Sequence, residues 1–298
     1  MKNVLLFLVA LVFAGTISLW VRYGGGAPYP DLSTSPILDA SSLEEVVRYS
    51  EPIGNVAVNR DGRLFFTVHP EARPKGNKLL EYVRGAAVPY PSGAAQAELF
   101  DTVLGVAIDR YNRLWTIDHG NHGLRRVRIV ANDLDTNVVI REQILDPEIA
   151  PAGSFLQDLQ VSADGNTIVI ADASFWRKSP AIIIYDVETG RARRVLESHA
   201  SVSAEDYVIR NNDREMKFLG GIVALRGGID GIALGPEWLY FGAISGSGLY
   251  RVRLRDLRDA SLPPGQLANR VERVGDKPLS DGMSIDIEGN VYITAIEH

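Results

Sequence analysis

Apolar and polar residues alternate in five short segments of the chain, and each segment leads through a turn into a second, more apolar run. Alternation of this kind is typical of β-strands, and a turn between two such runs predicts a hairpin. Asp61-Gly62, Asp164-Gly165 and Glu288-Gly289 supply the positive φ angles that tight hairpin turns require. The five predicted hairpins span residues 55–67, 105–117, 158–170, 231–241 and 282–294.

The hairpins recur at the interval expected for the blades of a β-propeller. Their turns fall at residues 61, 111, 164, 236 and 288, so the intervals are 50, 53, 72 and 52 residues. A four-stranded blade takes about 40 to 50 residues. The long interval contains residues 198–221, which we interpret as a loop over one face of the disc. Third strands are predicted at 78–83, 124–130, 181–187 and 249–254, and fourth strands at 138–144, 192–196 and 271–274.

The regular spacing favours a propeller over a β-sandwich or two stacked β-domains. No long amphipathic helix follows the N-terminal region, which argues against an α/β fold. We therefore predict an all-β fold of the six-bladed β-propeller type, built from residues 43–298.

The first 23 residues predict a signal peptide or an N-terminal membrane anchor. Residues 4–20 are uncharged and mostly apolar, with Lys2 before them and Arg22 after them. A membrane-spanning helix needs roughly 20 apolar residues, so this run of 17 fits either interpretation. Residues 24–42 are rich in Gly, Pro and Ser and predict a linker.

The blade count predicts an incomplete ring. Subtracting 42 residues from 298 leaves 256, which is room for about five blades of about 50 residues each. Only nine residues follow Gly289, enough for one strand, so we expect the C-terminal part of a six-bladed ring to be missing. Residues 43–49 are expected to form an outer strand that would pair with the closing blade.

Composition narrows the function. The chain has 31 Lys and Arg against 37 Asp and Glu, a net charge of −6, which argues against nucleic-acid binding. The absence of cysteine excludes disulfides, thiolate zinc sites and Cys nucleophiles. No glycine-rich phosphate loop, Gly-x-Ser-x-Gly or His-Glu-x-x-His motif occurs, so nucleotide binding and the common hydrolase mechanisms are disfavoured. We expect an exported, periplasmic or extracellular monomer that contacts the membrane only through its N-terminal segment.

Acidic and amide side chains are predicted to meet on the propeller axis, because the first strand of each blade lines the central channel. Aligning the hairpins places Asp230 and Asp281 at one station, with Asn55 and Asp158 one position further along their strands. Oxygen ligands of this kind suit Ca²⁺ or another divalent cation, and they equally suit an amine. Ca²⁺ or another divalent cation is therefore the candidate cofactor, with Asp230 and Asp281 as its candidate ligands. Each Asp could alternatively cap a turn.

A second set of polar residues stands where the second strands end. His119 follows Asp118 there, and a histidine can act as an acid or base near neutral pH. The candidate catalytic residues are Asp158, Asp230 and His119, and the candidate ligand-binding residues of the channel are Asn55, Asp118, Asp172 and Asp281.

Five stretches of the chain, in the same order, show a family resemblance. They are GVAIDRYNRLWTIDHG, FLQDLQVSADGNTIVIADAS, AIIIYDVETGRARRVLESH, GGIDGIALGPEWLYFGAISGSGLYRV and LSDGMSIDIEGNVYITAIEH. Together they resemble the major royal jelly/Yellow protein family, and most closely its bacterial branch, described as related to L-dopachrome tautomerase. The resemblance covers about residues 45–298. It implies a six-bladed propeller, secretion, and small molecules, such as biogenic amines, bound in the central channel.

The chain is also similar, more distantly, to gluconolactonase/senescence marker propellers, which hold a divalent metal at the channel mouth. Asp281 matches the Asp-Gly motif of that family, whereas Asp230 and Asn55 stand where its Asn and Glu ligands would be. Three functions therefore stay open. They are binding of an aromatic or amine-bearing molecule with isomerase-type or tautomerase-type activity, a metal-dependent lactonase, and a non-catalytic ligand-binding or scaffold propeller.

Overall fold

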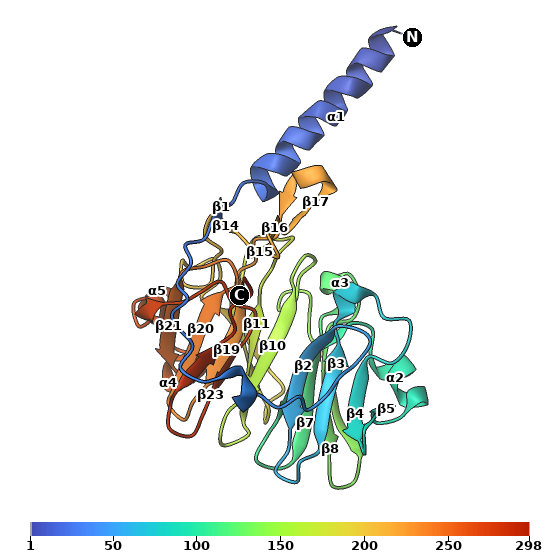
Figure 1. Ribbon diagram of the computed structural model, residues 1–298, viewed down its shortest axis with the longest axis vertical. Helices are drawn as coiled ribbons and strands as arrows, with labels where there is room; N and C mark the ends of the chain where they lie inside the picture. The colour runs from blue at the N-terminus through green and yellow to red at the C-terminus, as the bar shows by residue number, and fades with distance from the viewer. Residues whose placement is uncertain (1, 298) are drawn as a thin grey trace.

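Four four-stranded antiparallel sheets form the body of the protein in a computed structural model that describes residues 2–297 (Figure 1). In every sheet the strands are paired in chain order, and the first strands of consecutive sheets are neighbours. The predicted all-β propeller architecture is thereby confirmed. The four blades are β2 (Ile53–Val58), β3 (Leu64–Val68), β4 (Leu79–Val83) and β5 (Ala86–Pro89); β6 (Val103–Ile108), β7 (Arg113–Asp118), β8 (Arg128–Asp133) and β9 (Val138–Ile144); β10 (Leu156–Val161), β11 (Thr167–Asp172), β12 (Ala181–Asp186) and β13 (Ala192–Val195); and β19 (Ile229–Leu234), β20 (Trp238–Ala243), β21 (Gly248–Arg253) and β22 (Glu272–Asp276).

A fifth sheet has only two strands, β23 (Met283–Ile285) and β24 (Val291–Ile293). All five predicted hairpins are therefore present. The series of blades is open between β2 and β23, and side chains on its two flanks are exposed, among them Val56, Val58 and Tyr292.

Short strands and helices connect and extend the blades. Between β13 and β19 the chain forms β14 (Tyr207–Val208), β15 (Arg210–Asn211), β16 (Arg214–Glu215), β17 (Lys217–Phe218), η3 (Leu219–Gly221) and β18 (Val223–Ala224), in the region predicted as a loop over one face. The N-terminal helix α1 (Lys2–Tyr23) leads into β1 (Ala27–Pro28), which pairs in parallel with β14. The remaining helices are η1 (Ala40–Ser42), η2 (Pro70–Ala72), α2 (Gly93–Leu99), α3 (Gly120–Gly123), α4 (Leu254–Arg258) and α5 (Pro264–Ala268).

The outer strand predicted at residues 43–49 is wrong. This segment has no strand structure, and instead Val47 and Tyr49 pack on the flank of the first blade. The ring of Tyr49 meets Phe66 edge-on at 5.2 Å between centroids. Apolar burial against this open flank, and not pairing with a sheet edge, sets the course of the segment.

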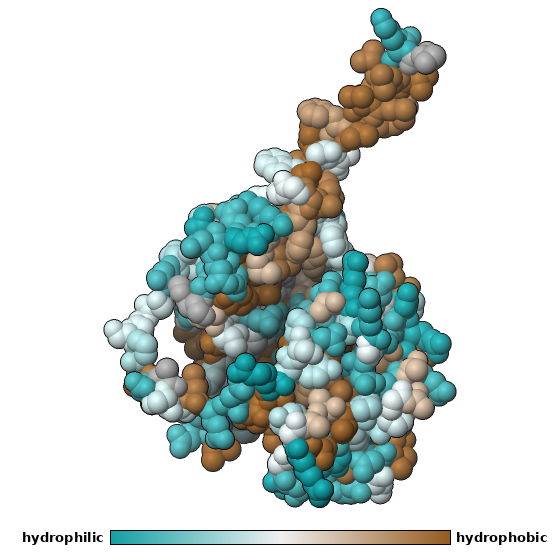
Figure 2. Space-filling view, turned by 45° about the vertical axis from the view of Figure 1, so that its right-hand side comes forward, coloured by the Kyte–Doolittle hydropathy of each residue, from teal (hydrophilic) through white to brown (hydrophobic). Residues whose placement is uncertain are grey.

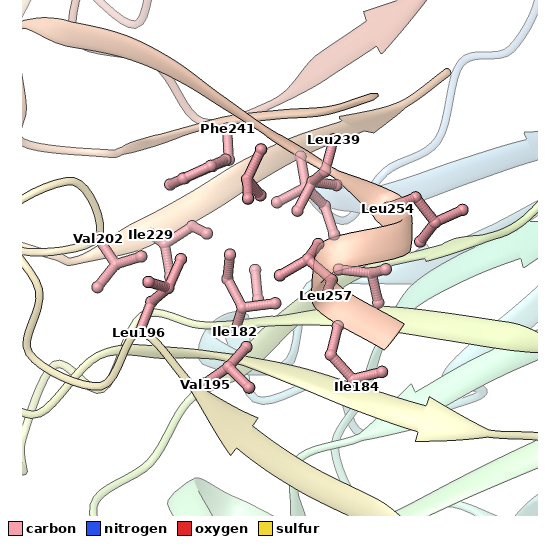
Figure 3. Close-up of a cluster of buried hydrophobic side chains, with 14 of the residues drawn as sticks. Ile182, Ile184, Val195, Leu196, Val202, Ile229, Leu239, Phe241, Leu254 and Leu257 are labelled. Atoms are coloured by element: carbon pink, nitrogen blue, oxygen red, sulfur yellow. The ribbon is translucent and has the colours of Figure 1, made fainter. Parts of the chain in front are cut away.

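Apolar side chains between neighbouring blades form the core. Figure 3 shows the cluster between the third and fourth blades, where Ile182 and Val195 face Ile229 and Phe241, and Leu257 of α4 closes one side. Each fully buried aliphatic or aromatic side chain of this kind contributes about 1.5–3 kcal/mol. Strands such as β11 are covered on both faces. Their sequences are therefore continuous apolar runs, without the alternation of apolar and polar residues seen in half-exposed strands.

The first strand of each four-stranded blade carries a β-bulge at the axis. The pairing register shifts between Ile53 and Val56, and the same shift recurs at 103/106, 156/158 and 229/232. A bulge redirects side chains, and bulges often lie next to functional sites. Residues at these register shifts line the axial cavity, namely Gly54, Asn55, Leu104, Gln157, Asp158 and Asp230.

Glycines allow the bulges of adjacent blades to pack closely. We therefore expect a glycine-to-alanine substitution to destabilise the protein at a crowded bulge and not at an open one. A Cβ atom on Gly105 would lie 2.7 Å from the carbonyl oxygen of Gln157 and 2.8 Å from Ile117 Cγ2, whereas one on Gly282 would meet nothing within 4 Å. We expect Gly105→Ala to lower the free energy of unfolding by about 1–3 kcal/mol and Gly282→Ala to leave it almost unchanged. Urea unfolding of both variants measures this; equal midpoints would contradict the close packing of the bulges.

Candidate functional site

A small cavity of about 210 Å³ lies on the axis and is lined mainly by the bulge residues. Asn55, Asp158, Asp230 and Asp281 all contribute to it. The structure therefore brings together the four residues that the aligned hairpins placed on the axis. They come from four different blades, which explains why they are far apart in the sequence.

Asp158 carries a strongly perturbed carboxyl group. Burial raises its pKa to about 7, against the opposing effect of hydrogen bonds that its oxygens accept from the backbone N–H groups of Leu159 and Ile232, at 2.8 and 3.4 Å. A carboxyl group with a pKa near 7 exchanges a proton readily at neutral pH. The group is therefore suited to acid–base chemistry.

Asp230 is almost fully buried beside Asp158. Burial, followed by the charges of Asp281 and Asp158, raises its pKa well above the usual value. Its Oδ2 has no hydrogen-bond partner among the described residues, so it can accept a hydrogen bond from a ligand in the cavity.

Lys277 lies near enough to Asp230 for their charges to interact, and it was not predicted from the sequence. Its Nζ donates hydrogen bonds to the carbonyl oxygen of Pro278 and to Ser280 Oγ, both at 3.0 Å. Burial lowers the pKa of Lys277 to about 8, although the negative charge of Asp230 works in the opposite direction. Gly242 makes room for this side chain, because a Cβ atom at that position would clash with Lys277 Cε.

A second, larger cavity of about 940 Å³ adjoins the axial one. His69, Gln157, Asp281 and Thr294 line both cavities. The walls of the larger cavity are mostly apolar and include Phe155, Phe175, Trp176, Phe218, Leu225 and Ile244. An apolar chamber therefore continues into a polar, acidic end.

An imidazole–carboxylate pair lies on the wall of the larger cavity. His122 Nε2 lies 2.9 Å from Glu71 Oε1, and this hydrogen bond is the main reason why the pKa of Glu71 is lowered. His69 lines both cavities, and burial lowers its pKa. Its Nδ1 accepts a hydrogen bond from the Glu71 backbone at 3.3 Å. These groups are able to bind a polar substituent of a ligand.

His119, a predicted catalytic residue, lies behind this wall and lines neither cavity. Its Nδ1 accepts a hydrogen bond from the His122 backbone at 3.0 Å, and its ring packs edge-on against Phe155. Burial lowers its pKa to about 3, so the ring is neutral at physiological pH. In this geometry His119 positions the His122 loop.

Asp118 and Asp172, predicted as ligand-binding residues, are fully buried and also lie outside both cavities. Asp118 accepts hydrogen bonds from the backbone of Asp101, Thr102 and Gly120. Asp172 accepts equivalent bonds from the backbone of Phe155 and Ser174. In both blades the carboxylate joins the end of the second strand to the chain that enters the first strand.

The predicted cation ligands do not form a complete donor set. In the range 2–297, no group of three or more His, Asp or Glu side chains is close enough together to hold a metal ion. Burial favours the protonated form of Asp230, whereas a divalent cation prefers ionised oxygen ligands. The positive charge of Lys277 also interacts with Asp230. Metal binding by Asp230 and Asp281 stays a prediction, to be tested by metal analysis of the purified protein.

Several residues in or near the site could not be predicted from the sequence, because they lie on loops outside the repeated hairpins. Trp176 and Phe155 belong to connections between strands. Lys277, which lines neither cavity but interacts electrostatically with Asp230, follows a fourth strand. One signal was available for His69, which follows the second strand of its blade as His119 does in the next.

The fold and the cavities define a β-propeller with a ligand-sized pocket at the mouth of its channel. The family model described as "Major royal jelly protein" matches residues 101–298, more than half of the chain. The chain belongs to this family, as its sequence motifs predict. The assignment to the bacterial branch stays a prediction, and no curated protein sequence matches the chain.

Similar solved structures share the propeller architecture at low sequence identity. One chain of a nidogen/laminin complex matches with 10% identity and a TM-score of 0.52, over 82% of this chain and 72% of its own length. A protein of unknown function from Bacteroides thetaiotaomicron matches with 13% identity and a TM-score of 0.51, over 83% of this chain and 57% of its own length. A gluconolactonase from Xanthomonas campestris matches with 16% identity and a TM-score of 0.46, over 83% of this chain and 71% of its own length. The first two matches support the fold alone.

Proposed function

We propose that this protein is an exported propeller, periplasmic or extracellular, that binds a small aromatic, amine-bearing molecule at the mouth of its channel. The observation that carries this proposal is the junction of the two cavities at His69, Gln157, Asp281 and Thr294. The larger cavity, about 940 Å³, falls within the range of about 300–1,000 Å³ that is usual for ligand pockets.

The two ends of the combined site suit the two ends of such a ligand. Phe155, Phe175 and Trp176 offer rings against which an aromatic group can pack. Asp281 lines the junction, and Asp158 lies beyond it in the axial cavity, so an ammonium group at the junction meets carboxylates. Ion pairing and hydrogen bonding to a carboxylate then hold the amine.

Asp158 is the proposed base of an isomerase-type or tautomerase-type reaction. With a pKa of about 7, it can take a proton from one atom of the bound molecule and return it to another atom of the same molecule. Because the proton returns to the same molecule, the reaction needs no co-reactant. In this proposal the buried carboxyl group of Asp230 donates or accepts a hydrogen bond as the charge of the ligand changes.

Calorimetric titration of Asp281→Asn tests the binding mode. We expect dopamine to bind this variant about tenfold more weakly than the unaltered protein, because one carboxylate at the junction is lost. 4-Ethylcatechol, which keeps the ring and lacks the amine, should bind both proteins equally. The matched control is Glu288→Gln, which removes an exposed carboxylate from the hairpin turn on the opposite face.

Equal dopamine affinity in Asp281→Asn and Glu288→Gln would contradict recognition of the amine at the junction. Binding without turnover by the unaltered protein would instead support the non-catalytic ligand-binding propeller. A stoichiometric divalent cation that is lost on Asp281→Asn would favour the metal-dependent lactonase.

A further inference from the structure

The helix α1 ends on the same face of the propeller as the larger cavity. The Tyr23 hydroxyl donates a hydrogen bond to the carbonyl oxygen of Trp176 at 2.6 Å, and Arg22 donates one to that of Arg177 at 2.8 Å. The rings of Tyr23 and Trp176 meet edge-on, 5.7 Å apart. Figure 1 shows α1 projecting away from the propeller beside β17.

The length and composition of α1 fit a membrane. Its 22 residues carry no buried side chain and correspond to about 33 Å of helix, enough to cross a hydrocarbon core of about 30 Å. Trp20, Arg22 and Tyr23 at its C-terminal end are residue types that collect at the membrane–water interface. Trp176 contacts Tyr23, so a bilayer that contains α1 would place Trp176 at the depth of the lipid headgroups.

Exposed apolar side chains surround this point. Trp176 is 42% exposed, Phe218 47% and Leu219 64%, and all three line the larger cavity. Figure 2 shows that the apolar surface of α1 continues onto the adjoining part of the propeller. Contiguous apolar surface of this kind is rare where a protein faces only water.

Cations accompany the apolar side chains. Arg22 and Arg73 form no ion pair with a carboxylate within residues 2–297, and Arg73 lines the cavity mouth. Lys178 Nζ lies over the rings of Tyr23 and Phe175, at 5.2 and 4.4 Å from their centroids. Basic and aromatic residues in one band match the headgroup layer of a membrane that contains anionic lipids.

We propose that α1 stays attached to the mature protein as an anchor, and that Trp176, Phe218 and Leu219 rest in the headgroup layer of the bilayer that contains α1. The mouth of the larger cavity then opens onto the lipid surface, and ligands enter it from the membrane interface. This orientation follows from the contacts of α1 and does not depend on which molecule the cavity binds.

Tryptophan quenching in vesicles tests the proposal on the full chain. In a Trp20→Phe background three tryptophans remain, of which Trp115 is buried and Trp238 begins β20 at the opposite end of its blade. With protein reconstituted into phosphatidylcholine/phosphatidylglycerol vesicles that carry a shallow spin-labelled lipid, we expect quenching that is lost when Trp176→Phe is added. Mass spectrometry of the membrane-purified chain should find α1 retained.

Two further variants give a matched comparison. Leu219→Ser, on the cavity side, should reduce the quenching of Trp176, whereas Ile287→Ser, which changes a fully exposed apolar residue on the turn between β23 and β24, should not. Quenching that is equal with and without Trp176→Phe would overturn the proposal, and so would a purified chain that lacks α1. A folding failure of Leu219→Ser leaves the Trp176→Phe comparison decisive.

Discussion

Arg194→Met is expected to lower the free energy of unfolding by about 3–5 kcal/mol, the usual effect of removing one partner of a buried ion pair. Arg194 Nη1 lies 2.8 Å from Asp172 Oδ2, and both side chains are buried. The same guanidinium group donates hydrogen bonds to the carbonyl oxygens of Ile149 and Ser179. Its loss removes the donor to Asp172 Oδ2 and to these two carbonyl oxygens, while the backbone hydrogen bonds to Asp172 Oδ1 remain.

The protonation state of Asp172 gives this prediction a second readout. Burial already raises the pKa of Asp172, and the positive charge of Arg194 opposes that shift. Without Arg194 the pKa should rise further, so that the stability of the variant continues to fall up to a higher pH.

Arg125→Met is the matched control for Arg194→Met, since Arg125 also pairs with an aspartate. Its guanidinium group lies 2.9 Å from Asp101 Oδ1, but the Arg125 side chain is 64% exposed. Solvent weakens such pairs, so this change should cost less than about 1 kcal/mol. Denaturant unfolding at pH 7 measures both variants. Similar losses would show that the buried pair has no special role.

Asp158→Asn is expected to stabilise the protein at pH 8 and to abolish the proposed proton transfer. The pKa of Asp158 is about 7 in the folded protein and about 3.9 in an unfolded chain. Between these values the folded state holds one more proton, so the free energy of unfolding falls as pH rises from about 4 to 7. Asparagine carries no charge at any pH, so the variant does not lose this part of the free energy of unfolding as the pH rises. A full shift of this size equals about 4 kcal/mol, and because the side chain keeps some exposure we expect about 2 kcal/mol.

A comparison with Asp164→Asn makes the sign of the effect testable. Hydrogen bonds from Ser162 and Arg258 help to lower the pKa of Asp164 to about 2, despite some burial, so its ionised form stabilises the folded state above about pH 4. Asp164→Asn should therefore lower stability at pH 8, where Asp158→Asn raises it. Thermal unfolding at pH 4 and pH 8 separates the two. An Asp158→Asn variant no more stable than the unaltered protein at pH 8 would contradict the raised pKa.

A gain in stability with a loss of function would mark Asp158 as a residue kept for its chemistry. Buried carboxyl groups that weaken a fold are usual at functional sites. If Asp158→Asn is more stable and still turns over substrate, another group is the base.

The hairpins and the axial residues could be predicted because both follow from short-range pattern. Alternation and Asp-Gly turns specify each hairpin locally, and repetition then predicts that equivalent positions meet on the axis. Asn55, Asp158, Asp230 and Asp281 were found in this way, and the structure places all four on one cavity.

Other parts of the site depend on contacts between segments distant in the sequence. Asp118 and Asp172 resemble channel residues in sequence, but the folded chain directs their oxygens to backbone N–H groups. The segment 43–49 looks like a strand, and the open flank of the first blade buries its apolar residues without pairing. Pattern alone does not reveal which surface a side chain will meet.

The sequence by itself determined the propeller architecture, the family and the ring of polar residues on the axis, since these rest on local turn geometry and on repetition. Only the tertiary structure decided that the axial cavity continues into an apolar chamber, and that the charge of Lys277 acts on Asp230. It also decided that α1 ends against Trp176. These features join loops from different blades, and their contacts and pKa values arise from burial that exists only once the blades pack together.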